Sequence, residues 1–261
     1  MQLLSSLIII VACDPKVKSM KNIIASFAIY LVFASSVTGA EIVSYVIKHP
    51  VYNIKVSQIF LDGEIVDGDY EKYLRVYQNV NSQNVVVSQL NLESGGGLVD
   101  DGLKIGRHVR RHAISTNIER HKNCFSSCAL IFLAGIVAVN GGKLGVHRSY
   151  LKSGSKLSFS QMEKTLSENH SEVTDYLREL RLPEKIIQNF LNTSSADMTL
   201  IKKILRYDSL YEEYLISNCG VSPEVDFSTT GKEANRKLRF KYYECTYYAQ
   251  NRAQKEAQGI K

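Results

Sequence analysis

Hydrophobic positions along this chain follow two periods, one typical of strands and one typical of helices. Residues 84–92 are rich in β-branched side chains, which predicts a buried strand of the kind found in parallel sheets. A glycine-rich turn follows at 93–97, and apolar or small residues then recur at helical spacing over 98–112. This order of strand, glycine turn and helix predicts backbone amides at the carboxyl edge of a sheet.

The same two periods predict further elements on both sides of this unit. We expect strands over 52–60, 113–118, 136–140 and 143–146, and helices over 70–80, 159–182, 183–191 and 199–216. Strands that alternate with helices favour right-handed crossovers and a mostly parallel sheet, so the predicted fold class is α/β.

The stretch from Cys124 to Gly135, Cys-Phe-Ser-Ser-Cys-Ala-Leu-Ile-Phe-Leu-Ala-Gly, predicts a helix that is buried on all sides. The start of such a helix offers unpaired N–H groups and the positive end of its dipole, so a serine there can attack a carbonyl group while the amides stabilise the oxyanion. His147 follows the turn at 141–142 and the strand at 143–146, and it is a candidate base. Close packing of small residues is the simpler explanation of the helix start, and the three elements together favour a nucleophile.

The N-terminal 40 residues have the pattern of a targeting signal. Lys21 precedes an apolar run at 23–33, and small residues lead to Ala40, after which cleavage is expected. An earlier apolar run ends at Cys13 like a bacterial lipoprotein box, and Met20 is the favoured alternative start. We therefore predict an exported bacterial protein, periplasmic or secreted, with a membrane anchor at its N-terminus as an alternative.

Length and charge limit the other classes of function. A chain of 261 residues with 44% hydrophobic content can form one sizeable core, for which we expect the range 41–217, followed by a polar appendage at 218–261. The net charge is +6, but the basic runs at 107–112 and 236–241 are short and carry no nucleic-acid motif. We expect solvated helix faces there and no nucleic-acid partner.

The cysteines agree with export. Besides Cys13 there are Cys124, Cys128, Cys219 and Cys245, and an even number in an exported chain predicts disulfides. A Cys219–Cys245 bond would hold the tail to the body, whereas Cys124 and Cys128 lie near the limit of disulfide geometry, so all pairings stay open. No second cysteine pair or histidine motif at metal-ligand spacing accompanies them, and no metal site is predicted.

Three motifs, at 92–102, at 124–135 and at Gly145-Val-His147, together resemble the proteolytic subunit of Clp protease (ClpP) and its exported bacterial relatives. The resemblance covers about residues 54–205. It implies the ClpP/crotonase fold of repeated ββα units, with the active site at helix N-termini and extra C-terminal helices that can contact other copies in a homo-oligomer. It further implies an ATP-independent serine peptidase that cleaves peptides or proteins without a cofactor.

Carried over residue by residue, the resemblance implies Ser127 as the nucleophile, with Ser126 as the alternative, and His147 as the general base. Asp197 is the candidate for the carboxylate that orients the imidazole, and Asp175 is the runner-up. The oxyanion hole would consist of two backbone N–H groups, that of Gly96 or Gly97 and that of Cys128.

Two other functions remain open. A Ser–Lys protease like signal peptide peptidase would use a lysine as its base, and Lys122 and Lys143 are near in sequence. A catalytically inactive binding or scaffold protein could have the same fold. Departures from the family pattern, such as Gly95 in place of a proline and Phe125 in place of a small residue, keep the inactive alternative open.

Overall fold

The computed structural model describes residues 39–48, 54–151, 157–201, 205–207 and 232–259. The predicted targeting segment, apart from its last two residues, lies outside them. The elements in chain order are β1 (Glu41–Lys48), β2 (Lys55–Asp62), α1 (Asp69–Asn81), β3 (Val86–Glu93), α2 (Val99–Arg111), β4 (Ser115–Ile118), β5 (Asn123–Phe125), α3 (Ser127–Leu133), β6 (Val137–Asn140), β7 (Lys143–Val146), α4 (Phe159–Glu179), α5 (Glu184–Asn192), β8 (Thr199–Ile201), β9 (Leu205–Tyr207) and α7 (Lys232–Ala257).

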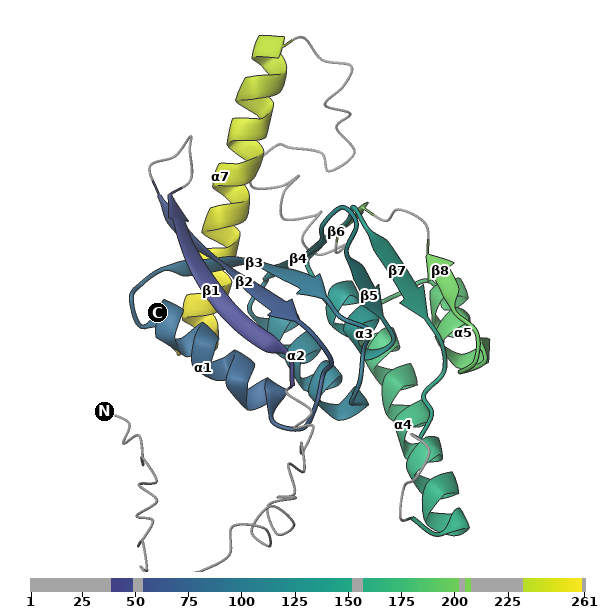
Figure 1. Cartoon of the computed structure of the whole chain (residues 1–261). Helices are drawn as coiled ribbons and strands as arrows, with labels where there is room; N and C mark the ends of the chain where they lie inside the picture. Colours follow the sequence, from purple (N-terminus) through teal and green to yellow (C-terminus); the bar gives the residue numbers. More distant parts are fainter. Residues whose placement is uncertain (1–38, 49–53, 152–156, 202–204, 208–231, 260–261) are drawn as a thin grey trace, which may run out of the picture. The chain divides into compact units, whose positions relative to one another are not determined.

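The strands form two sheets. The larger sheet has six strands in the order β1-β2-β3-β4-β6-β9, and the smaller has three in the order β5-β7-β8. In the larger sheet β2, β3, β4 and β6 are parallel to one another, and the edge strands β1 and β9 are antiparallel to their neighbours. Figure 1 shows α1 and α2 next to the larger sheet, and α3 and α4 near the smaller one. The predicted α/β class with a mostly parallel sheet is confirmed.

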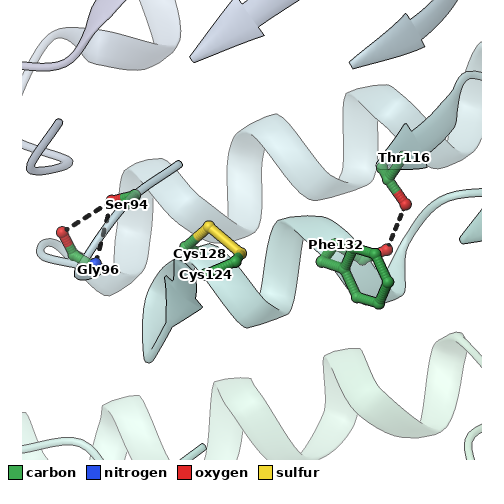
Figure 2. The surroundings of a disulfide bond; sticks show 6 residues. All are labelled: Ser94, Gly96, Thr116, Cys124, Cys128 and Phe132. Carbon is green, nitrogen blue, oxygen red and sulfur yellow. Dashed lines mark hydrogen bonds between the residues drawn. A yellow bond between two sulfur atoms is a disulfide. The ribbon is translucent and has the colours of Figure 1, made fainter. Parts of the chain in front are cut away.

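Helix α3 forms the centre of the core. Every residue from Ser127 to Leu133 is buried, as the uninterrupted apolar run predicts. The hydroxyl of Tyr176 in α4 donates a hydrogen bond of 2.9 Å to the carbonyl of Leu130, and the hydroxyl of Thr116 in β4 donates one of 2.6 Å to that of Phe132. The second of these bonds is drawn in Figure 2. Because α3 is held from two sides, its N-terminus has a defined position relative to the sheet.

The expected helix over 199–216 is wrong where the structure describes it. Residues 199–201 and 205–207 are the strands β8 and β9, which pair antiparallel with β7 and β6. Both are edge strands of three residues, so they exist through pairing with distant segments and not through a local pattern. Residues 208–216 lie outside the described range.

The polar C-terminal region is more than an appendage. Its described part is the helix α7, and its residues Gln250 and Gln254 are each only 2% exposed. The Gln254 side chain accepts a hydrogen bond of 3.1 Å from the Val87 N–H and donates one of 2.8 Å to the Val87 carbonyl. These bonds satisfy backbone groups of β3 close to the point where the β2–β3 register shifts. Helix α7 therefore packs onto the α/β domain.

Among the residues that the structure describes, no helix combines the length and apolar character needed to cross a bilayer.

Candidate active site

The glycine turn after β3 and the start of α3 line a common cavity of about 460 Å³. Gly95, Gly96 and Gly97 border it from the turn, Ser126 from the start of α3, and His147 from the end of β7. The cavity therefore brings together three motifs that are well separated in the sequence. It lies at the carboxyl ends of β2 and β3, where open α/β sheets bind ligands.

Ser126 occupies a sharp turn between β5 and α3. Its backbone has φ 55° and ψ −123°, a conformation that non-glycine residues rarely adopt and that costs about 1–3 kcal/mol. Its N–H donates a hydrogen bond of 3.0 Å to the Gly145 carbonyl, and its own carbonyl accepts one of 2.9 Å from the Ala129 N–H, which begins the helix. A serine on a strained strand-to-helix turn is the arrangement that exposes a nucleophilic hydroxyl.

Ser127, the expected nucleophile, is directed elsewhere. It is only 1% exposed, and its Oγ has no hydrogen-bond partner among the described residues. It packs against α2, where a Cβ placed on Gly102 would lie 3.1 Å from the Ser127 Cβ. Ser127 does not line the main cavity, although it borders a space of about 20 Å³ beside it. The turn therefore directs Ser126 to the cavity and Ser127 to the core, and the choice of the nucleophile stays a prediction.

His147 borders both of these spaces, as Ser126 does, and is 8% exposed. Its Nδ1 lies 2.8 Å from the carbonyl oxygen of Arg148. A carbonyl group only accepts hydrogen bonds, so Nδ1 carries the proton and donates it, and in the neutral ring Nε2 is the basic nitrogen. The N–H of Arg148 in turn donates a hydrogen bond of 3.0 Å to the Thr193 carbonyl, which fixes this segment.

The structure does not bring Asp197 to His147. Asp197 is exposed, and its backbone N–H bonds to the Ser194 carbonyl at 3.0 Å within its own loop. Asp175, the runner-up, is also exposed, on α4. Within the described ranges neither carboxylate forms an ion pair or hydrogen bond with the imidazole, whose Nδ1 is already bonded to a backbone carbonyl. A backbone acceptor has taken the place in which a carboxylate was expected.

The expected oxyanion hole is partly revised. The Gly96 N–H donates a hydrogen bond of 3.0 Å to the Ser94 hydroxyl, as Figure 2 shows, so this amide is occupied. The Gly97 N–H has no hydrogen-bond acceptor in the described part of the chain. Gly96 lies so close to the nucleophile turn that a Cβ on it would be 2.6 Å from the Ser126 Cβ and 3.2 Å from the Ser127 nitrogen. The Gly96 N–H is therefore already bonded within the turn, and the expected roles of the Gly97 and Cys128 N–H groups stay predictions.

Among the residues that the structure describes, three acidic side chains border the cavity and no lysine or arginine does. Asp62 ends β2, Glu64 follows that strand, and Glu93 ends β3 and forms an ion pair with Lys122. These described carboxylates disfavour anionic ligands. No group of three or more histidine, cysteine, aspartate or glutamate side chains in the described residues could hold a metal ion.

The lysines of the Ser–Lys alternative lie away from the cavity. Lys122 forms an ion pair with Glu93, and Lys143 is exposed on β7. Neither lysine borders the cavity that Ser126 and His147 share.

One predicted disulfide is present beside the nucleophile. Cys124 at the middle of β5 and Cys128 in the first turn of α3 are bonded, with their Cα atoms 5.2 Å apart (Figure 2). Both residues are fully buried. Cys245 is also disulfide-bonded, whereas Cys219 lies outside the described residues and its predicted pairing stays a prediction.

Sequence reasoning missed Ser94 and Tyr150. The Ser94 hydroxyl organises the glycine turn, and Tyr150 borders the cavity with its ring centre 5.6 Å from that of His147. Ser94 could have been found, because a serine directly before three glycines is a common way to hydrogen-bond a turn. Tyr150 has no comparable signal in the sequence.

The strand–glycine turn–helix–strand–helix order, with the cavity at the helix start, is the arrangement that the motifs predict. No known protein family and no curated protein matches the sequence.

Solved structures provide three comparisons. The first is a serine-to-alanine mutant of the 1510-N membrane-bound stomatin-specific protease, with 18% identity and a TM-score of 0.42 over 58% of this chain and 74% of that one. A lysine-to-alanine mutant of the same protease, in complex with a substrate peptide, has 17% identity and a TM-score of 0.40 over 54% and 66%. An asparagine-to-aspartate mutant of ClpP1 from Listeria monocytogenes has 14% identity and a TM-score of 0.44 over 55% and 81%. These comparisons concern the fold alone.

Proposed function

We propose that this protein is an ATP-independent serine peptidase in which Ser126 is the nucleophile and His147 the general base. The observation that carries the proposal is the strained turn of Ser126, a serine that borders the same cavity as His147 and Gly97. A buried helix start alone would be a packing feature, but packing does not require a strained serine that borders a polar cavity.

The reaction follows from these positions. Nε2 of His147 takes the proton of the Ser126 hydroxyl as Oγ attacks the carbonyl carbon of a peptide bond. The oxygen of that carbonyl becomes an oxyanion, for which the N–H groups of Gly97 and Ser127 are the donors. The C–N bond then breaks, His147 passes the proton to the leaving amine, and water hydrolyses the acyl-enzyme by the reverse sequence.

A backbone carbonyl lies where the triad carboxylate was expected, and among the described residues no carboxylate contacts His147. The Arg148 carbonyl holds the imidazole in the tautomer that leaves Nε2 basic. It carries only a partial charge, so it stabilises the imidazolium less than a carboxylate does. We therefore expect a slower peptidase than one with a complete triad.

The charges at the cavity indicate which peptides it accepts. Because Asp62, Glu64 and Glu93 border it and no cationic side chain among the described residues does, we propose that neutral or basic residues near the scissile bond are preferred over acidic ones. Export to the periplasm or the exterior is part of the proposal, and the Cys124–Cys128 disulfide supports it because disulfides persist in oxidising compartments.

A non-catalytic binding protein is the second candidate. The observation that favours it is the absence of a carboxylate at His147 among the described residues. Such a protein would keep the cavity for peptide binding but would not activate its serine.

The test is the rate at which a fluorophosphonate probe labels the oxidised full-length protein. We expect labelling of the wild type, a loss of at least about 1,000-fold in Ser126→Ala, and a rate within about threefold of wild type in Ser127→Ala, whose backbone N–H is unchanged. Ser127→Ala also removes a buried hydroxyl without a partner, so its free energy of unfolding should not fall by more than about 1 kcal/mol.

Lys122→Ala tests the Ser–Lys mechanism against the serine–histidine mechanism. Its labelling rate should stay within about threefold of wild type, because only a surface ion pair with Glu93 is lost. A large loss would instead favour the Ser–Lys mechanism, and a folded wild type that is not labelled at all would favour the binding protein.

A further inference from the structure

We infer that the Cys124–Cys128 disulfide is a positioning device for the nucleophile, and that Ser126 becomes reactive only when these two thiols have been oxidised. The inference rests on the proposed function, and it adds a regulation of the same site by redox state.

The disulfide joins the two ends of the nucleophile turn. Cys124 belongs to β5 and Cys128 to the first turn of α3, and Ser126 and Ser127 lie in the segment that the bond closes. In Figure 2 the sulfur–sulfur bond connects the strand to the start of the helix. Both cysteines are fully buried while Ser126 borders the cavity, so the bond lies on the core side of the turn.

The turn needs such a restraint because Ser126 is strained. A residue at φ 55° and ψ −123° keeps that conformation only where its surroundings determine it. On the strand side, the Phe125 N–H donates to the Ser94 carbonyl and the Ser126 N–H to the Gly145 carbonyl, each at 3.0 Å. On the helix side, the bond from the Ala129 N–H to the Ser126 carbonyl is local to the turn itself. The disulfide is the covalent link from the paired strand to the helix start.

Reduction would displace the turn. Two thiols cannot stay as close as two bonded sulfur atoms, because non-bonded heavy atoms rest at about 3.5–4.0 Å. Cys124 is held in register with Leu144 of β7 and bridges to Ser94, and Cys128 sits in a fully buried helix. The short, strained segment between the two cysteines is therefore the part that moves when the disulfide is reduced.

The displacement matters because it changes the distance between the two N–H donors of the proposed oxyanion hole. The Ser127 N–H moves with the nucleophile turn, whereas the Gly97 N–H belongs to the separate glycine turn, whose φ of 145° is set by close contact with the backbone of Ile65. A shift of about 1 Å between reacting groups can cost about 100-fold in rate. The disulfide thus acts on the chemistry of Ser126 through geometry, without contacting the substrate.

The redox step is a two-electron exchange. The thiols of Cys124 and Cys128 lose two electrons and two protons and form one S–S bond, and an organic disulfide, of a protein oxidant or of oxidised glutathione, is reduced to two thiols. Since both cysteines are buried in the folded protein, the bond forms as the turn packs. The chain would therefore be inactive where thiols stay reduced and become active after reaching an oxidising compartment.

The test compares two pairs of substitutions in the full-length oxidised protein. Cys124→Ala with Cys128→Ala removes the bond at the turn, and Cys219→Ala with Cys245→Ala is the matched control, because Cys245 is disulfide-bonded on α7. The readouts are the maximal rate of fluorophosphonate labelling, the probe concentration for half that rate, and the final labelled fraction.

We expect the maximal rate to fall at least tenfold in the first pair, with the half-saturating probe concentration within threefold of wild type, and to stay within twofold in the control pair. A purely structural role would lower the labelled fraction and leave the rate of the folded molecules unchanged. A folded first pair that labels at the wild-type rate would overturn the inference.

A titration covers the case in which the first pair does not fold. The control pair, which keeps Cys124 and Cys128, is equilibrated in glutathione buffers of increasing oxidising strength, and disulfide content is measured by alkylation and mass spectrometry. The labelling rate should rise with the fraction of Cys124–Cys128 disulfide, and a rate independent of that fraction would refute the inference. Absence of labelling in the oxidised wild type would instead overturn the proposed function, and this inference with it.

Discussion

Two nearly buried histidines of this protein have opposite chemical surroundings. His147 borders a polar cavity, and one of its ring nitrogens is bonded to a backbone carbonyl while the other is basic. His108, on α2, stacks on His112 with ring centres 3.8 Å apart and lies against Tyr77 at 4.5 Å. Burial, with the positive charge of His112 when it is protonated and of Arg111, lowers the pKa of His108 to about 3.

The difference shows that burial alone does not make a histidine functional. Burial among aromatic rings favours the neutral form of the His108 ring and lowers its pKa, its Nδ1 lies 3.2 Å from the Tyr73 hydroxyl, and it does not border the cavity. His147 is as buried but faces a space that a substrate can enter. We expect the surroundings of His108 to affect stability and those of His147 to affect activity.

The largest expected difference between the two histidines concerns activity, because only His147 is proposed as the base. His147→Ala should lower the rate of fluorophosphonate labelling by about 100- to 10,000-fold, because general-base catalysis contributes that much. The free energy of unfolding should change far less. His121→Asn, at an exposed histidine with positive φ, is the control, and an unchanged labelling rate in His147→Ala would show that this histidine is not the base.

The next effect concerns stability in acid. The pKa of His108 is lower in the folded protein than in the unfolded chain, so below about pH 6.5 the unfolded state binds a proton that the folded state does not. The stabilisation from neutral His108 is complete above that pH and is lost as the pH falls toward 3, by roughly 5 kcal/mol at most. His112, whose pKa burial also lowers, adds to this trend.

Chemical unfolding between pH 7 and pH 4 measures this slope. His108→Asn removes the titrating group and keeps a polar atom near Tyr73, so its slope should be shallower than that of wild type, even if its stability at pH 7 is lower. His170→Asn, at an exposed position on α4, should keep the wild-type slope. Equal slopes in all three proteins would contradict the assignment of the acid sensitivity to His108.

The smallest expected effect comes from the docked C-terminal helix. Gln254→Leu removes the bonds to both backbone groups of Val87 and the 3.2 Å bond to the His112 carbonyl, and it leaves these buried groups without partners. We expect a loss of about 2 kcal/mol in the free energy of unfolding and no change in the labelling rate of folded protein. Gln258→Leu, at an exposed position, is the control. If both variants unfold alike, α7 does not contribute to the domain as the structure indicates.

The local hydrophobic pattern was sufficient to predict the two helices α2 and α3 beside the site. The apolar spacing over 98–112 predicted α2 at Val99–Arg111, and the uncharged run after Cys128 predicted the buried α3. Both are recognisable because a periodic or uninterrupted apolar pattern reports burial directly. The strands β8 and β9 were missed, because strands of three residues are stabilised by the strands they pair with and not by their own sequence.

The site itself was predicted in part. The glycine turn, the pair of serines and His147 were identified as the candidate chemistry, and the structure brings the turn, Ser126 and His147 to one cavity. Ser126 and not the favoured Ser127 borders the cavity, because one residue along a sharp turn exchanges a cavity-facing side chain for a core-facing one. The carboxylate partner was expected from the family resemblance, by its distance from the histidine along the chain, and such a distance does not determine which group lies beside an imidazole.

The sequence by itself determined the α/β class, the glycine turn, the fully apolar helix and the histidine that follows the strand, because each depends on residues close together in the chain. The tertiary structure decided which serine borders the cavity, that a backbone carbonyl orients His147, and that the C-terminal helix supports β3. These features depend on side-chain direction and on contacts between segments far apart in sequence, and both arise only when the chain packs.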